Sequence, residues 1–228
     1  MNQDTNIAAV ELAAESLGPL MDELVLVGGC AVGLLVTDKA RPPVRETIDV
    51  DLLTEVTPLS NYYVFCKRLQ AQGFRQRPTE AVICRWFKGA LVVDVMPTDP
   101  DVLGFTNRWY ESALSTAVPC RLPSGRQVRV ITAPHFLATK LEAFASRGKG
   151  DYMHHDIEDI VNIVDGRESI GEEVQRTELS LRQFLMNEFD DLLADSVFVE
   201  QISFHLGSHE HLFRKDIVLT RMRKIAGL

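Results

Sequence analysis

The sequence lacks the features that mark membrane, secreted and fibrous proteins. None of its 228 residues fall in a run approaching the roughly 20 consecutive apolar residues that cross a bilayer. Its first residues lack the basic start of a secretory signal, and there is no internal repeat, coiled-coil heptad or low-complexity tract. With a hydrophobic content of 46%, these absences predict an ordinary globular protein of the cytoplasm that has no membrane partner.

Cysteine and positive charge are also scarce. The cysteines are Cys30, Cys66, Cys84 and Cys120. They are widely spaced and never form a Cys-x-x-Cys pair, so we expect reduced core thiols. The net charge of −8 argues against a general nucleic-acid binder, because such proteins use excess cations to displace counterions from phosphate.

Charge is unevenly distributed along the chain. Residues 101–150 hold seven Lys and Arg against three Asp and Glu, whereas residues 151–228 hold eight against 16. The cationic region comprises Arg108, Arg121, Arg126, Arg129, Lys140, Arg147 and Lys149. It could receive the phosphates of a nucleotide or an RNA end, and a merely solvated basic surface explains it equally well.

A change of pattern near residue 132 predicts two domains. The expected strands are 24–27, 47–54, 81–87 and 91–96, with a further hairpin over 118–131. The expected helices are 6–17, 30–36, 58–72, 106–117, 134–146, 153–165, 178–194, 196–205 and 213–226. This order predicts an α/β (α+β) fold, with an α/β domain over residues 1–132 and a helical domain over residues 133–228.

Three aspartates are the strongest candidates for chemistry. Side chains two apart on a strand share a face, so Asp49 and Asp51 are expected about 6.5–7 Å apart, where they could hold a cation. Asp94 interrupts the apolar run 91–95, where an unpaired carboxylate is costly, so it needs a partner. The alternatives are a solvated strand face for the first pair, and Arg85 or a helix start as the partner of Asp94. Taken together, the three acids favour a site for Mg²⁺, or Mn²⁺, completed by substrate phosphates.

Gly28 and Gly29 lie between an expected strand and an expected helix. Glycines there allow close backbone approach and present free N–H groups, together with the positive end of the helix, to an anion. Many tight turns look the same, and the position upstream of the Asp49–Asp51 strand is what makes a phosphate-binding role plausible.

These motifs resemble the nucleotidyltransferase superfamily of DNA polymerase β-like enzymes. The resemblance covers Leu26-Val27-Gly28-Gly29, Asp49-Val50-Asp51 and Val93-Asp94-Val95. Downstream, Lys140, Arg147 and the run from Asp156 to Ile160 are similar to motifs of the AbiEii/AbiGii-like toxin branch. The similarity extends over about residues 24–165.

The resemblance implies a fold, a function and a role for each residue. Residues 1–132 would be a catalytic domain with a mixed sheet, and the helical domain 133–228 would contribute to the nucleotide or acceptor site. The resemblance also implies a metal-dependent nucleotidyltransferase that moves NMP from an NTP to an acceptor hydroxyl, with Asp49, Asp51 and Asp94 as catalytic metal ligands. Gly28 and Gly29 would cradle phosphate. Lys140 would contact the triphosphate, and Asp156 or Asp159 would position the nucleotide or the acceptor. The branch implies the toxin of a bacterial toxin–antitoxin pair that modifies RNA such as a tRNA end, with an antitoxin protein as partner.

Several alternatives stay open from the residues alone. Asp156 and Asp159 share a helix face, which is more often solvent-facing than functional. The pairs His154-His155 and His209-Glu210-His211 could suggest a transition metal, but neither has convincing further ligands, so we interpret them as structural or surface histidines. The acceptor could instead be an aminoglycoside or a protein hydroxyl, or the chain could be a nucleotide-binding module without turnover.

Overall fold

Two compact units make up the computed structural model. Unit 1 comprises Met1–Leu34 and Arg45–Thr132, and unit 2 comprises Leu35–Val44 and Ala133–Leu228. The structure describes residues 5–38, 44–55, 59–78, 80, 82–103, 106–206 and 212–228. Pro58 and Ala81, where a helix and a strand were expected to start, and the pair His209 and His211 lie outside these ranges.

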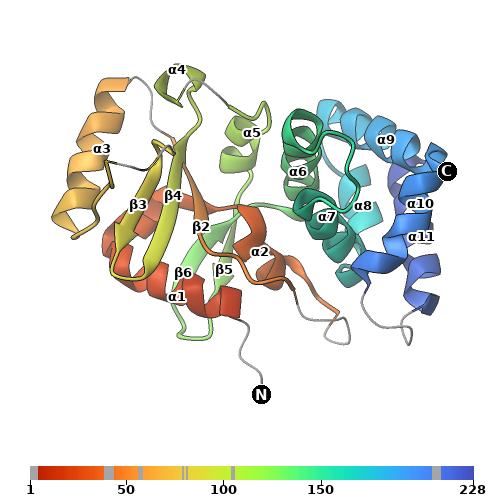
Figure 1. The fold of residues 1–228 in the computed structure, drawn as a ribbon, viewed down its shortest axis with the longest axis horizontal. Coiled ribbons are helices and arrows are strands. Elements are labelled where there is room, and N and C mark those ends of the chain that lie inside the picture. Colours follow the sequence, from red (N-terminus) through yellow and green to blue (C-terminus); the bar gives the residue numbers. More distant parts are fainter. Residues whose placement is uncertain are drawn as a thin grey trace. The chain divides into compact units, whose positions relative to one another are not determined.

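Unit 1 is built on a mixed six-stranded sheet (Figure 1). The strands are β1 Leu24–Leu26, β2 Val50–Thr54, β3 Arg85–Lys88, β4 Leu91–Pro97, β5 Val118–Arg121 and β6 Gln127–Val130. Their order is β3-β4-β2-β1-β6-β5, with β2 parallel to β4, β1 parallel to β6 and the other neighbours antiparallel. The mixed sheet with its helices confirms the α/β fold class expected from the sequence.

Helices pack against this sheet, and the turn that follows β1 lies beside β2. They are α1 Thr5–Leu17, the 3₁₀ helix η1 Gly18–Glu23, α2 Gly28–Leu35, α3 Leu59–Ala71, α4 Pro100–Leu103 and α5 Tyr110–Ser115. The stripe Val10, Ala13 and Leu17 is fully buried, and α1 packs against β2 and β4. Tyr62 on α3 donates its hydroxyl to the carbonyl of Val95 at 3.2 Å, which fixes α3 beside β4.

Unit 2 is helical. Its helices are α6 Ala133–Arg147, α7 His155–Gly166, α8 Ile170–Gln175, α9 Leu179–Ala194, α10 Ser196–His205 and α11 Leu212–Ala226. Helix α7 is central, because Ile157, Ile160 and Val164 are fully buried and α6, α10 and α11 all pack on it. Among the described helices, none has both the length and the apolar character required to span a bilayer.

The segment after α2 is tied into unit 2. The backbone N–H groups of Thr37 and Asp38 both donate to the carbonyl of Gly166 at 2.9 Å. Arg214 on α11 binds the carboxylates of both Asp38 and Asp165 at 2.8 Å. These long-range contacts explain why residues far upstream of position 132 belong to unit 2.

Some elements differ from the sequence expectation. Strand β2 begins at Val50 rather than at Thr47, because the N–H of Thr47 donates to the side chain of Asn6 and the carbonyl of Asp49 accepts from Cys30. Side-chain contacts thus replace ladder hydrogen bonds before Val50. Helices α4 and α8 were not expected, since four and six residues are too few to show a helical period.

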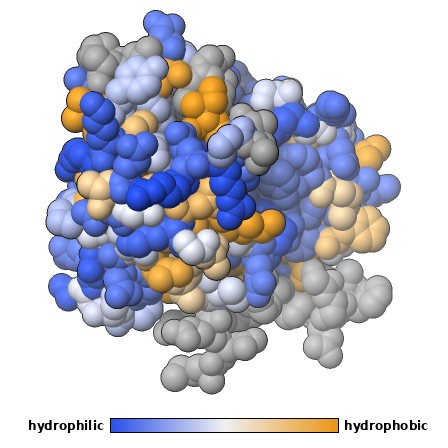
Figure 2. All heavy atoms as spheres, turned by 60° about the vertical axis from the view of Figure 1, so that its left-hand side comes forward, coloured by the Kyte–Doolittle hydropathy of each residue, from blue (hydrophilic) through white to orange (hydrophobic). Residues whose placement is uncertain are grey.

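The surface has an ordinary polar character. Figure 2 shows one face of the molecule on which hydrophilic residues predominate and apolar residues gather in smaller patches between them. Exposed large apolar side chains of unit 1 include Ile48, Tyr63, Val64 and Ile83. Scattered exposure of this kind is normal for a folded protein and does not by itself indicate a partner.

Candidate functional site

The turn between β1 and α2 lies directly against Asp51. Gly28 has a φ of +63°, and a Cβ at this position would come within 1.8 Å of Oδ2 of Asp51. The N–H of Val27 donates to the carbonyl of Asp51 at 2.9 Å. Position 28 therefore requires glycine for two reasons: its positive φ disfavours other residues, and the carboxylate of Asp51 occupies the space of a Cβ. Gly29 is buried in the first turn of α2.

Asp94 has a partner in Arg85. Strand β3 pairs with β4 so that Arg85 lies opposite Asp94, and its guanidinium donates to both carboxylate oxygens at 2.8 and 2.7 Å. The same guanidinium also binds the carboxylate of Asp49. The hydrogen bonds that Arg85 donates to Asp94 raise the pKa of Arg85, so the guanidinium is charged throughout the accessible pH range. Of the partners that the sequence left open for Asp94, the structure provides Arg85.

Asp49 is held in place by its backbone as well as by Arg85. It lies one residue before β2, and its carbonyl accepts from the Cys30 thiol at 3.2 Å. The Cys30 sulfur lies 2.7 Å from the hydroxyl of Thr47. Cys30 is fully buried at the start of α2, so this thiol ties the approach to β2 to the glycine turn. That positioning role was not apparent from the sequence.

The three aspartates and Arg85 form one group, which we name the strand cluster. Asp51 and Asp94 are register partners on the parallel strands β2 and β4, and Arg85 joins Asp94 to Asp49. Within the described residues, the aspartates are not a set whose ligand atoms all lie within 4.8 Å of one another. Arg85 was considered in the sequence only as a partner of Asp94. The hairpin between the two strands contains the signal for this contact. A turn at Gly89 and Ala90 pairs Lys88 with Leu91, and the same register places Arg85 opposite Asp94.

The donor set of the strand cluster fits a divalent cation. Among the residues named here, three carboxylates lie with one guanidinium, and carboxylate oxygens are the ligands that Mg²⁺ and Mn²⁺ prefer. Asp51 adds an oxygen beside the glycine turn. Since Arg85 binds Asp49 and both oxygens of Asp94, a cation held by those two carboxylates would compete with the guanidinium.

A second group of charges lies in unit 2, and we name it the helix cluster. It contains Lys140 and Arg147 on α6 and Asp156 and Asp159 on α7. Lys140 binds Asp156 at 3.1 Å and Asp159 at 2.7 Å, while Arg147 grips Asp156 through two N–H groups at 2.8 and 2.7 Å. Asp156 and Asp159 are buried, which corrects the expectation of a solvent-facing pair.

Electrostatics in the helix cluster favour the ionised acid. Burial raises the pKa of Asp156, but the hydrogen bonds from Arg147 and the charge of Lys140 outweigh it and lower that pKa to about 2. Lys140 is itself buried between its two carboxylates. The role of Lys140 toward a triphosphate, and those of Asp156 and Asp159 toward nucleotide or acceptor, stay predictions.

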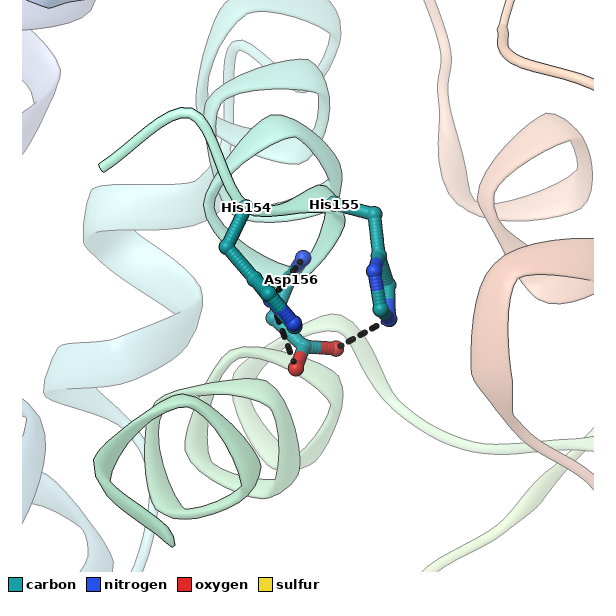
Figure 3. Close-up of side chains that lie close together, drawn as sticks. All are labelled: His154, His155 and Asp156. Carbon is teal, nitrogen blue, oxygen red and sulfur yellow. Dashed lines mark hydrogen bonds and ion pairs between the residues drawn. The ribbon is translucent and has the colours of Figure 1, made fainter. Parts of the chain in front are cut away.

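Two histidines face Asp156 at the start of α7. In Figure 3 both imidazoles point toward the carboxylate, with Nδ1 of His154 and Nε2 of His155 at 3.3 and 3.6 Å from its oxygens. Among the described residues, this is the set of three potential metal ligands that lies within 4.8 Å. Nδ1 of His154 also accepts from the N–H of Asp156, so it caps α7.

Charge balance distinguishes the two clusters as cation sites. In the helix cluster, two carboxylates already face two cations, and Arg147 also approaches Nε2 of His155 at 3.4 Å. Burial lowers the pKa of His155, so the imidazole is neutral at pH 7 and adds no charge. A divalent ion there would meet Arg147 and Lys140 without a surplus of negative charge, which supports a structural role for the histidine pair.

The cationic region of the sequence is distributed over both units. Arg126 and Arg129 donate to the carbonyls of Ala14 and Leu114, and Lys140 and Arg147 belong to the helix cluster. Much of its charge therefore has protein partners, which weakens the case for a single phosphate-binding surface.

Unit 1 also has a surface cavity of about 430 Å³. It is lined by Glu23, Thr54, Glu55, Asn61, Val64, Phe65, Arg68 and Arg129. Thr54 and Glu55 are at the C-terminal end of β2, whereas Asp51 is near its beginning. Of the residues that the sequence singled out, Arg129 of the cationic region lines this cavity, and none of the aspartates of the strand cluster does.

Comparison with known proteins identifies the fold. No family model and no curated protein matches the sequence. Among solved structures, the chain is similar to an antigenic nucleotidyltransferase-like protein from Paracoccidioides brasiliensis, with 17% identity and a TM-score of 0.54. The match covers 92% of this chain and 97% of that one. The chain thus has a nucleotidyltransferase-like fold, whereas the AbiEii/AbiGii-like branch stays a prediction.

Proposed function

We propose that this chain is a metal-dependent nucleotidyltransferase that transfers NMP from an NTP to an acceptor hydroxyl. The observation that carries the proposal is the strand cluster on a nucleotidyltransferase-like fold. There, Asp51 is packed against the Gly28 turn, lies in register with Asp94 and belongs to a group of three carboxylates, two of which share Arg85. A solvent-exposed strand face without a binding function would require neither a glycine at position 28 nor a buried acid at position 94.

Each part of the strand cluster has a role in this reaction. Gly28, Gly29 and the N-terminus of α2 would bind phosphate oxygens through backbone N–H groups. Asp49, Asp51 and Asp94 would hold Mg²⁺ or Mn²⁺. The bound ion would supply positive charge against the triphosphate and lower the pKa of the acceptor hydroxyl.

The bond changes are those of an in-line displacement. The acceptor oxygen forms a bond to the α-phosphorus while the bond from that phosphorus to the bridging oxygen breaks, and pyrophosphate leaves with the electron pair. The acceptor proton passes to a carboxylate oxygen of Asp94 or to water. Asp94 accepts a proton only once its oxygens are released from the guanidinium of Arg85.

For the acceptor we propose a hydroxyl of an RNA end, such as that of tRNA. The support is the resemblance of Lys140 and the Asp156–Ile160 run to a toxin branch, together with the basic residues of unit 1 that remain exposed, such as Arg121. This would make the chain the toxin of a toxin–antitoxin pair in the cytoplasm, with an antitoxin protein as its partner.

A transfer assay tests the proposal directly. Purified protein is incubated with Mg²⁺, each α-labelled NTP in turn and total RNA, and label in RNA is measured. We expect Asp51→Asn to lower incorporation by about 10³-fold, because one metal ligand and its charge are lost. Asp101→Asn, at an exposed acid of α4, is the matched control and should change incorporation less than about twofold.

The same assay distinguishes the rival functions. Label that appears only on an added aminoglycoside, or only on protein, would keep the reaction and replace the acceptor. Binding of NTP without transfer to RNA, aminoglycoside or protein would contradict the proposal and favour a nucleotide-binding module.

A further inference from the structure

Arg85 binds two of the carboxylates that the proposed reaction assigns to a metal ion. Its guanidinium binds both oxygens of Asp94 and one oxygen of Asp49, two of the three carboxylates proposed as metal ligands. Arg85 comes from β3, outside the strand pair that carries Asp51 and Asp94. The cation between these acids is therefore supplied by the chain itself.

We propose that Arg85 is a built-in counter-cation that closes the metal site and is displaced when a divalent ion binds. A buried carboxylate without a partner is costly, and Asp94 has a side chain only 9% exposed. Arg85 compensates the charge of Asp94 and also binds Asp49. The inference rests on the proposed function only in taking these acids as metal ligands.

Exposure makes the exchange feasible. The side chain of Arg85 is 24% exposed and that of Asp49 is 28% exposed, so the guanidinium lies at the edge of unit 1 and can reach water without unfolding. Exchange of the guanidinium for a divalent ion adds one positive charge to the carboxylates that now share Arg85. The released guanidinium would then be available to triphosphate oxygens, which arginine binds well.

The exchange predicts competition between arginine and metal. Removing the guanidinium should tighten divalent-ion binding, since the ion no longer has to displace a cation and meets one more net negative charge. It should also make the stability of unit 1 depend on metal, because only the metal would then compensate the buried Asp94.

The primary test measures metal binding without nucleotide. Mn²⁺ binding to wild type and Arg85→Gln is followed by electron paramagnetic resonance, and we expect the variant to bind at least about tenfold more tightly. Asp94→Asn in the Arg85→Gln background should abolish that gain. Arg68→Gln is the matched control. Arg68 also forms an ion pair with a carboxylate of unit 1, that of Glu23, which is not part of the strand cluster.

Thermal unfolding provides a second readout. The melting temperature of Arg85→Gln should fall in EDTA and recover in Mn²⁺, whereas that of wild type and of Arg68→Gln should change little between the two conditions. If Arg85→Gln does not fold, Arg85→Lys replaces it, because lysine keeps the charge but cannot bind both oxygens of Asp94 and Asp49 as a planar fork. Arg85→Lys should bind Mn²⁺ more tightly than wild type.

A wild-type measurement avoids substitution altogether. The Nε–H proton of Arg85, assigned by its loss in Arg85→Lys, should be protected from exchange in metal-free protein and should lose that protection on addition of Mg²⁺. Equal or weaker Mn²⁺ binding by both variants, or an Arg85 signal unchanged at saturating Mg²⁺, would overturn the inference. Tighter metal binding by the variants with no NMP transfer by wild type would sustain it and reject the proposed function.

Discussion

The strand cluster of unit 1 and the helix cluster of unit 2 combine the same residue types with opposite results. The helix cluster pairs two buried carboxylates with two cations, and its charges are balanced. The strand cluster places three carboxylates around one guanidinium, which is itself 24% exposed. A buried network with paired charges serves structure, whereas several carboxylates that share one partly exposed cation are suited to binding a different cation.

The largest effect on stability should come from removing the Asp156 carboxylate from the helix cluster of unit 2. Asp156→Ala leaves Lys140 and Arg147 without their shared carboxylate, so we expect the free energy of unfolding to fall by about 3–5 kcal/mol. Urea denaturation measures this, with Asp190→Ala at an exposed position of α9 as control, expected within about 0.5 kcal/mol of wild type. A loss below about 1 kcal/mol would mean that the network contributes little.

The next effect concerns the glycine that adjoins the strand cluster. Gly28→Ala adds a Cβ where Asp51 Oδ2 lies and strains a φ of +63°, so we expect a loss of about 2–4 kcal/mol and a displaced Asp51. Gly18→Ala has nearly the same φ, +57°, with nothing within 4 Å of the added atom. It should lose only about 1 kcal/mol. Equal losses in the two variants would exclude a special contact at Gly28.

The helix cluster should also confer acid sensitivity. The pKa of Asp156 is lowered from 3.8 to about 2 in the folded state, so its contribution to stability is present above pH 3.8 and is lost as the pH falls through 2. We expect a decrease of about 2 kcal/mol over that window. Unfolding free energies of wild type and Asp156→Asn, compared between pH 5 and pH 2, should converge; a constant difference would contradict the assignment.

The smallest effect should come from the histidine that faces Asp156. Because the helix cluster has no negative charge to spare, His155→Asn should leave the affinity of the protein for Co²⁺ unchanged and alter stability by less than about 0.5 kcal/mol. Titration followed by the visible spectrum of Co²⁺ measures the first quantity. A tenfold loss of Co²⁺ affinity would instead identify His154, His155 and Asp156 as a metal site.

Sequence patterns identified most of the elements and much of the candidate site. The apolar run of β4 and the apolar stripe of α7 come directly from burial, so these elements were correctly located. The expected alternation over 47–54 located β2 but began it too early, since Ile48 is exposed and the strand begins at Val50. Short helices such as α8 were missed for lack of a period. Asp94 was expected to need a partner because it interrupts an apolar strand, and that expectation was confirmed.

The sequence by itself determined the α/β first half, the helical second half and the requirement that Asp94 be compensated, because hydrophobic periodicity and the cost of a buried charge are local properties of the chain. Only the tertiary structure decided which cation compensates it. The choice of Arg85 depends on the register of β3 against β4, and the burial of Asp156 and Asp159 depends on the packing of α6 against α7. Both are contacts between segments distant in sequence, and these contacts set the charge balance of each cluster.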